Sequence, residues 1–179
     1  ALGVLWGCNK GATEGQKEKY VVDVSSDSLF VKKVENLPDD FILGMDASCV
    51  PSIEKGGVRY YDHDGAEKDV YEILRNNGIN YIRVRVWNDP FDANGNGYGG
   101  GNCNIDTALA IGQRATKYGM KLLVNFQYSD FWADPAKQMA PKAWASMNID
   151  QKSEALYAYT KDCLQQLLDA GVEVGMVQI

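Results

Sequence analysis

Apolar residues recur with two alternating periods along residues 41–179, which predicts strands and helices in regular alternation. Short apolar or β-branched runs predict four strands, at 41–46, 81–87, 121–127 and 174–179. Helical spacing predicts three helices between them, at 67–77, 106–118 and 150–170. A glycine follows each predicted helix, at Gly78, Gly119 and Gly171, and a strand begins at once. Such a glycine closes a helix by adopting positive φ, so the repeated phrase is typical of βα units around a parallel sheet.

The strand at 81–87 favours a barrel over a doubly wound sheet, although both folds alternate strand and helix. Its even positions are aliphatic, and its odd positions share the opposite face: Tyr81, Arg83, Arg85 and Trp87. A doubly wound central strand is normally apolar on both faces, whereas two arginines on one face suit a barrel interior near a polar site. Structural ion pairs are the alternative interpretation.

We therefore predict an α/β fold, a (β/α)8 TIM barrel, of which this chain holds about the first four strands and three helices. A barrel needs eight strands over typically about 250 residues. We expect Ile179 to be a truncation within the fourth strand, and we expect a half barrel to expose apolar strand edges and helix faces.

The N-terminal segment, residues 1–25, has a different character from the rest. An apolar run ends in a small residue and Cys8, and a polar, glycine-containing stretch follows at 9–25. This resembles the end of a bacterial lipoprotein signal, whose cysteine is lipidated; a frayed apolar end with a chance cysteine is the alternative. We predict a signal remnant and linker at 1–25, and a barrel domain at 26–179 with a short additional strand at 29–34. We also predict lipidation at Cys8 and an extracytoplasmic protein, secreted or lipid-anchored at the bacterial surface.

Charge and composition exclude several classes of protein. The formal net charge is −6 and no basic run exists, which argues against a nucleic-acid partner and is compatible with a neutral polysaccharide. No stretch reaches the roughly 18–20 apolar residues of a membrane span, so the only predicted membrane link is the anchor at Cys8. The cysteine spacings match no zinc pattern. Cys163 is expected in the core, while pairing of Cys49 with Cys103, both in loops on one predicted face, stays open.

Polar and aromatic side chains gather where the predicted strands end, which is where barrel enzymes place their sites. Sugar rings stack on Trp and Tyr, and sugar hydroxyls bind carboxylates, amides and guanidinium groups, so the pattern predicts a carbohydrate-binding face. The residues at these strand ends are Asp46, then Arg83, Arg85, Trp87, Asn88 and Asp89, then Gln127, Tyr128, Asp130 and Trp132.

Two other features carry less chemistry. The Gly- and Asn-rich loop at 92–102 lacks the Lys-Ser/Thr of a P-loop and the carboxylates of an EF-hand, so we expect a surface loop beside the cleft. His63 lies in a turn composition and is expected to be solvated.

Three phrases of the sequence resemble glycoside hydrolase family 53, the endo-β-1,4-galactanases. They are GINYIRVRVWNDP at 78–90, GMKLLVNF at 119–126 and YSDFWADP at 128–135, and the resemblance covers about residues 41–179. It implies a (β/α)8 barrel that cuts β-1,4-galactan in (arabino)galactan with retention of configuration, using one protonated and one ionised glutamate. The family carries these glutamates in a Gly-Asn-Glu phrase ending the fourth strand and at the end of the seventh. Val177-Gln178-Ile179 matches the text just before Gly-Asn-Glu, so we expect both catalytic glutamates to lie beyond Ile179.

The resemblance implies supporting roles for residues of this chain. Arg83 matches the arginine beside the nucleophile, whose charge keeps that carboxylate ionised. The substrate-binding positions that it implies are Asp46, Arg83, Trp87, Gln127, Tyr128, Asp130 and Trp132. It implies no cofactor for this half of the barrel, with calcium an open question in the other half.

One position departs from the family, because relatives usually carry histidine where this chain has Gln127. The neutral amide indicates either an altered subsite preference or a weakened enzyme kept for glycan binding. We predict a retaining endo-galactanase, with a non-hydrolysing cell-surface glycan-binding protein as the alternative. Another retaining barrel hydrolase, such as a mannanase, is a further candidate.

Overall fold

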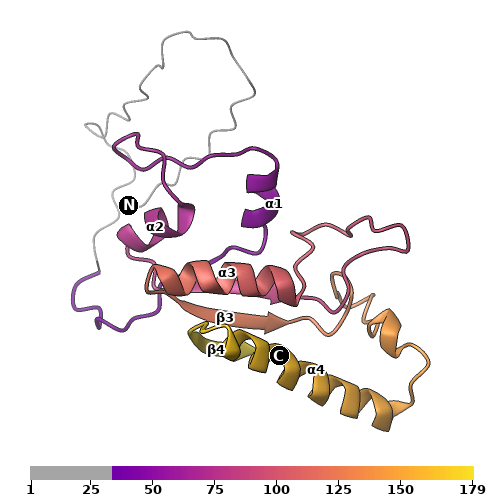
Figure 1. The fold of residues 1–179 in the computed structure, drawn as a ribbon. Coiled ribbons are helices and arrows are strands. Elements are labelled where there is room, and N and C mark those ends of the chain that lie inside the picture. Colours follow the sequence, from indigo (N-terminus) through magenta and orange to yellow (C-terminus); the bar gives the residue numbers. More distant parts are fainter. Residues whose placement is uncertain (1–33) are drawn as a thin grey trace. The chain divides into compact units, whose positions relative to one another are not determined.

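The computed structural model describes residues 34–179 (Figure 1). Cys8, the linker at 9–25 and all but Val34 of the strand expected at 29–34 lie outside the described residues. Every helix and strand of the described part belongs to one compact unit, residues 42–179.

Four parallel strands form one sheet in the order β1-β2-β3-β4. Their bounds are Gly44–Asp46 for β1, Tyr81–Val86 for β2, Lys121–Phe126 for β3 and Val174–Gln178 for β4. Each strand pairs with the next in sequence, whereas the strand order of a doubly wound sheet reverses at a switch point. The sequential parallel order is that of a (β/α)8 barrel, of which four strands are present, and it confirms the predicted fold class.

Helices α2 (Val70–Asn76), α3 (Ile105–Lys117) and α4 (Ile149–Asp169) correspond to the three predicted ones. Asp69, Asn104 and Asn148 cap their N-termini by accepting hydrogen bonds from backbone N–H groups of the first turn. The glycines that follow them, Gly78, Gly119 and Gly171, have φ of 90°, 71° and 73°. Helix α1 (Val50–Lys55) and the 3-10 turn η1 (Lys142–Trp144) were not predicted, because each is shorter than two helical turns and shows no helical period.

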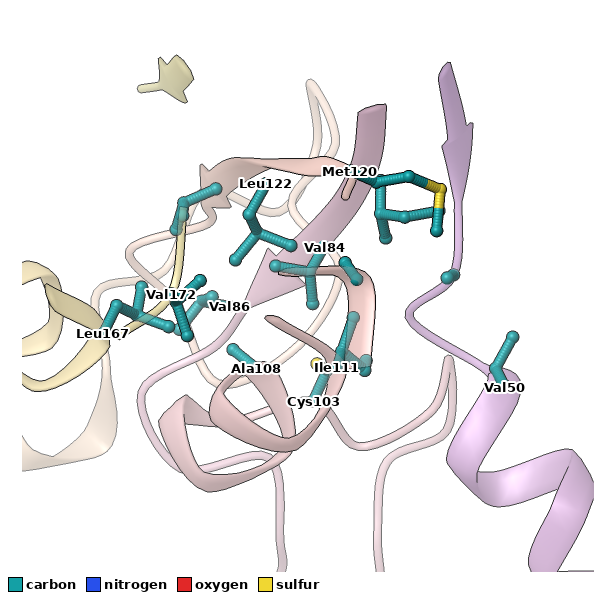
Figure 2. Packing of buried hydrophobic residues seen from close by; sticks show 14 of the residues in the cluster. Val50, Val84, Val86, Cys103, Ala108, Ile111, Met120, Leu122, Leu167 and Val172 are labelled. Atoms are coloured by element: carbon teal, nitrogen blue, oxygen red, sulfur yellow. The ribbon is translucent and has the colours of Figure 1, made fainter. Parts of the chain in front are cut away.

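The core lies between one face of the sheet and α3 and α4 (Figure 2). Val84 and Val86 of β2 and Leu122 of β3 are fully buried there, against Ala108 and Ile111 of α3. Helix α3 comes close to the chain after α4 because residue 112 is glycine: a Cβ there would lie 2.7 Å from Val172 Cγ1. Cys163 is 1% exposed, as its place in the helical pattern predicted.

The edge strand β4 carries an irregularity that matters for the other face of the sheet. Leu122 pairs with Val174 while Leu123 pairs with Met176, so Gly175 is an extra residue that opposes neither. The ring of Tyr81 fills the space that a side chain at residue 175 would need, since a Cβ there would lie 2.6 Å from the Tyr81 hydroxyl. Beyond this bulge Gln178 pairs with Asn125.

Apolar side chains are exposed on β4 and α4, as expected for four strands of a barrel. Val177 is 46% exposed, and Tyr157 and Leu168 of α4 are 68% and 58% exposed. None of the helices in residues 34–179 has the length and apolar character to cross a membrane.

Candidate active site

The face of β2 that points away from the helices carries the polar side chains. Burial alternates strictly along the strand, with Ile82, Val84 and Val86 fully buried and the odd positions half-buried. Arg83 pairs in register with Leu123, and Arg85 pairs with Asn125. Because side chains alternate between faces, these arginines and Asn125 share one face of the sheet near its C-terminal edge.

Arg83 connects three strands across this face. Its Nη1 donates to Asp46 Oδ2 of β1 at 2.5 Å, and its Nε donates to Gln178 Oε1 of β4 at 3.3 Å. The side chains of Arg83 and Asp46 are 33% and 31% exposed. The pair is therefore anchored by charge-assisted hydrogen bonds and still open to a ligand.

Arg85 lies two residues further along β2, and its guanidinium group packs against the rings of Trp87 and Trp132. Its Nη2 donates to Gly100 O at 3.1 Å and to Cys49 Sγ at 3.4 Å, and lies 3.7 Å from Asp46 Oδ1. The guanidinium carbon is 4.5 Å from the ring centroid of Trp132, which is cation–π distance. Both arginines of β2 thus form the ion pairs that were the alternative interpretation, and they form them at the strand ends where a barrel site is expected.

The two tryptophans differ in exposure and therefore in what they can contact. Their rings meet edge to face with centroids 5.2 Å apart, but Trp87 is 1% exposed and Trp132 is 47% exposed. Trp132 can offer a ring to a sugar, while the buried Trp87 holds it by the edge-to-face contact. Gly100 makes this packing feasible, since a Cβ there would lie 2.9 Å from Trp87 Cη2 and 3.1 Å from Trp132. The loop at 92–102 is thus in direct contact with the site.

Asp130 is buried and organises the loops around the site. It is 4% exposed, and its two oxygens accept from the backbone N–H of Asp89 at 3.0 Å and of Lys142 at 2.8 Å. The Lys142 ammonium donates to Asp89 Oδ2 at 2.7 Å and to Phe91 O at 2.7 Å. The hydrogen bond to Asp89 raises the pKa of Lys142. This network joins the loop after β2 to the loop after β3.

Gln127 and Tyr128 take different directions after β3. The Gln127 amide donates to Asn125 Oδ1, on the face that carries Arg85. Tyr128 has φ of 45°, and its hydroxyl lies 2.8 Å from Thr160 Oγ1 of α4. Its ring stacks on Phe126 with centroids 5.5 Å apart. The described contacts of Tyr128 are therefore with α4 and Phe126, and the structure does not bring it to the Asp46–Arg83 pair.

The cysteines near the site are free thiols. Cys49 and Cys103, for which pairing was open, form no disulfide in the described structure. Cys103 is fully buried, and burial raises its pKa to about 12. Within residues 34–179 no group of three or more His, Cys, Asp or Glu side chains is placed to hold a metal ion. His63 is exposed, as predicted.

A family model described as Glycosyl hydrolase family 53 matches residues 42–179. The chain belongs to this family. A Bacillus subtilis (strain 168) protein named endo-beta-1,4-galactanase is 52% identical over 164 residues, covering 92% of this chain and 38% of the relative. An arabinogalactan endo-beta-1,4-galactanase of Humicola insolens is 42% identical over 136 residues, covering 76% of this chain and 38% of the relative.

Solved structures agree with the sequence relatives. The Ignisphaera aggregans GH53 catalytic domain superposes with a TM-score of 0.80 at 44% identity, covering 84% of this chain and 42% of that one. The chain thus spans about two fifths of the length of the relatives that it matches. The resemblance stated from the sequence is confirmed at the level of the family.

Sequence reasoning missed several residues that build this family 53 site. Ser48 is fully buried, and its Oγ accepts from the backbone N–H of Arg85 at 2.9 Å. Asn125 holds the Gln127 amide, and Lys142 holds the two loops together. No local pattern marks Ser48 or Lys142, because their roles depend on contacts between segments far apart in the chain.

Proposed function

We propose that the protein to which these residues belong is a retaining endo-β-1,4-galactanase that cleaves the galactan of (arabino)galactan. The observation that carries the proposal is the convergence of the Asp46–Arg83 pair and the exposed ring of Trp132 at neighbouring strand ends of a family 53 chain. The names of the relatives from Bacillus subtilis and Humicola insolens support galactan as the substrate.

In this proposal Trp132 provides the stacking surface for one galactose ring. It is 47% exposed, and its position is fixed by the Arg85 guanidinium over the ring and by the edge-to-face contact with Trp87. A fixed aromatic surface orients a sugar ring before reaction, which reduces the entropy lost on binding.

Arg83 has the supporting role in this proposal. A guanidinium next to a carboxylate favours the ionised form, so Arg83 would keep a neighbouring nucleophile charged. Asp46 and Gln178 fix the direction of the Arg83 side chain. The reaction also needs two carboxyl groups roughly 5–5.5 Å apart. In this proposal they are glutamates at the ends of the fourth and seventh strands, outside the 179 residues of this sequence.

The test is incubation of the complete protein with β-1,4-galactan, with β-mannan and β-glucan as matched controls. We expect new reducing ends from galactan alone, and NMR of the first products should show the β-anomer. A lack of new reducing ends would refute hydrolysis, and release of the α-anomer would refute retention. Cleavage of mannan in place of galactan would assign a mannanase.

A non-hydrolysing glycan-binding protein is the second candidate, favoured by Gln127. Its amide is engaged with Asn125 and cannot carry the charge of an imidazole. On this alternative, galactan in the gel slows the migration of the protein in affinity electrophoresis, but the protein releases no new reducing ends from galactan. The variant Gln127→His tests the position: an increase in kcat would show that the amide weakens an enzyme, and a change in KM alone would show altered subsite preference.

We further propose that the protein acts outside the cytoplasm, anchored by a lipid on Cys8. The apolar run that ends at Cys8 supports the anchor, and a polymeric substrate requires action outside the cell. Cys8→Ala should move the protein from the membrane fraction to the soluble fraction. Two-carboxylate chemistry requires no cofactor. Calcium binding elsewhere in the barrel stays a prediction, which a chelator titration of thermal stability would test.

A further inference from the structure

An aromatic pair with one exposed ring lies next to the site but outside the residues described for it. Tyr98, in the loop after β2, is 45% exposed, and it meets Phe131 edge to face with ring centroids 5.8 Å apart. Phe131 is half-buried and belongs to the loop after β3. Exposed aromatic rings held in place by neighbours are typical of binding surfaces, because they offer a large contact area with little loss of side-chain entropy.

The backbone of Tyr98 is fixed although its loop is rich in glycine. Its own N–H donates to Pro90 O at 3.0 Å, and the N–H of Gly99 donates to Asn102 Oδ1 at 2.7 Å. Gly97 allows Asn102 to pack against the chain, since a Cβ at residue 97 would overlap the Asn102 amide. The ring of Tyr98 is therefore presented from an ordered loop.

Lys142 ties this pair to the site. Its ammonium lies 5.8 Å from the ring centroid of Tyr98, and the same group holds Asp89 and Phe91 of the loop that carries Tyr98. Asp130 binds the backbone N–H of Lys142. One network thus fixes both loops and orients the aromatic pair relative to them.

The aromatic pair belongs to the same two loops as Gly100 and Trp132. Phe131 and Trp132 are consecutive, so their Cα atoms are about 3.8 Å apart, and on the opposing loop Tyr98 contacts Phe131 while Gly100 contacts Trp132. The two loops therefore run side by side with Trp132 and Tyr98 both exposed, at 47% and 45%. A chain of sugars lying on Trp132 can extend onto Tyr98.

We propose that Tyr98, supported by Phe131 and Lys142, is an accessory sugar-stacking platform that binds a part of an extended β-linked galactan chain beyond the unit on Trp132. The inference rests on the proposed function. It predicts that Tyr98 contributes to the binding of long galactan chains and not to the binding of short ones. Stacking in this platform contributes to binding of long substrates and leaves the chemical step unchanged, because Tyr98 does not contact Asp46 or Arg83 in the described structure.

The experiment compares Tyr98→Ala, Tyr98→Phe and Tyr61→Ala in the complete protein. Tyr61 is a matched control, an exposed tyrosine (55%) in the loop between α1 and α2. For Tyr98→Ala we expect KM for polymeric galactan to rise about three- to tenfold, the range that one aromatic contact provides. We expect kcat to be unchanged, and kcat/KM to be unchanged for the shortest oligosaccharide that the wild-type protein cleaves. Tyr98→Phe keeps the ring and should resemble the wild type, as should Tyr61→Ala.

Thermal unfolding and affinity electrophoresis on galactan distinguish sugar stacking from a role in loop structure. A role in loop structure alone predicts that Tyr98→Ala lowers the unfolding midpoint and affects short and long substrates equally, which would overturn the proposal. If the wild-type protein cleaves galactan and Tyr98→Ala has the wild-type KM for polymer, the inference fails while the proposed function stands. If the protein binds galactan through Tyr98 without cleaving it, the proposed function fails and the platform stands. Absence of both binding and cleavage overturns both.

Discussion

Two arginines of this chain, Arg114 and Arg85, each lie over an aromatic ring at the same distance but have very different partners. The Arg114 guanidinium is 4.5 Å from the ring centroid of Tyr71, and Arg85 is 4.5 Å from that of Trp132. Arg114 donates to both oxygens of Glu54, at 2.7 and 2.8 Å, and to Asp69 at 2.9 Å. These carboxylates raise its pKa.

Arg85 binds a carbonyl, a thiol and one carboxylate at 3.7 Å, and its Nε is buried without a hydrogen-bond partner in the described structure. The comparison indicates that Arg114 joins α1, α2 and α3 through charge-assisted hydrogen bonds. Arg85, with a side chain that is 12% exposed, instead positions Trp132 and Asp46 at the site. The comparison predicts that loss of Arg114 mainly affects stability and that loss of Arg85 mainly affects activity.

The largest effect is expected for Arg114→Met in the complete protein. Removing the cation leaves Glu54 and Asp69 facing each other in a partly buried site, which should reduce the free energy of unfolding by about 3 kcal/mol. Activity below the unfolding transition should stay within about twofold of wild type. Urea unfolding measures the change. Arg59→Met is the control, because the Arg59–Glu67 pair is over half exposed, and its loss should change stability by less than about 0.5 kcal/mol.

Arg85→Met tests the prediction that loss of Arg85 mainly affects activity. Methionine retains an apolar contact beneath Trp132 but provides no hydrogen-bond donor. We expect kcat/KM for galactan to fall about thirtyfold, roughly 2 kcal/mol of transition-state stabilisation. The free energy of unfolding should change by less than in Arg114→Met. Equal destabilisation by the two variants, with no loss of activity for Arg85→Met, would show that both arginines are structural.

A smaller effect on activity is expected for Trp132→Ala, which removes the exposed ring that packs against Arg85. The KM for galactan should rise about tenfold through the lost stacking, with little change in stability because the side chain is half exposed. Trp132→Phe should recover part of the affinity. Steady-state kinetics on polymeric galactan measure this KM. A wild-type KM for Trp132→Ala would show that Trp132 does not contribute to galactan binding.

The smallest effect concerns Cys103, which is coupled electrostatically to Arg85 and also to Tyr71. Burial raises its pKa from 9.0 to about 12, so above pH 9 the unfolded chain loses this proton while the folded chain keeps it. The unfolded state then binds fewer protons, and stability falls as pH rises. Between pH 8 and 10 this contributes a loss of about 1 kcal/mol. Urea unfolding should show that the free energy of unfolding falls less steeply above pH 9 in Cys103→Ala than in the wild type. An equal fall in the two proteins would contradict the assignment.

The parts of the fold that follow from local pattern were predictable from the sequence. The alternation of β2 separated a helix-facing side from a polar side, and the structure has the same separation. The glycines after α2, α3 and α4 marked the helix ends because they adopt positive φ. These features depend on periods of two and 3.6 residues, which the sequence displays directly.

The positions of Tyr128 and Asp130 could not be predicted in the same way. Positive φ at Tyr128, rare for an aromatic residue, sends its side chain to α4, and nothing in the local sequence signals it. Asp130 is buried because backbone N–H groups of residues 89 and 142 satisfy it, one of them 41 positions away. A strand-end carboxylate looks the same in sequence whether it binds a ligand or two loops.

The bulge at Gly175 decides which side chains β4 offers to Arg83. Because of this extra residue Met176 and Gln178 lie on the face of Leu123 and Asn125, and Val177 lies on the face of Val124. If Gly175 instead paired regularly with Leu123, every later side chain of β4 would turn over, placing Val177 beside the arginines and the amide of Gln178 among the helices. For protein engineering, residue 175 therefore sets the register of β4: an inserted or deleted residue between Gly175 and Gln178 that left the bulge in place would exchange the two faces of the strand after it.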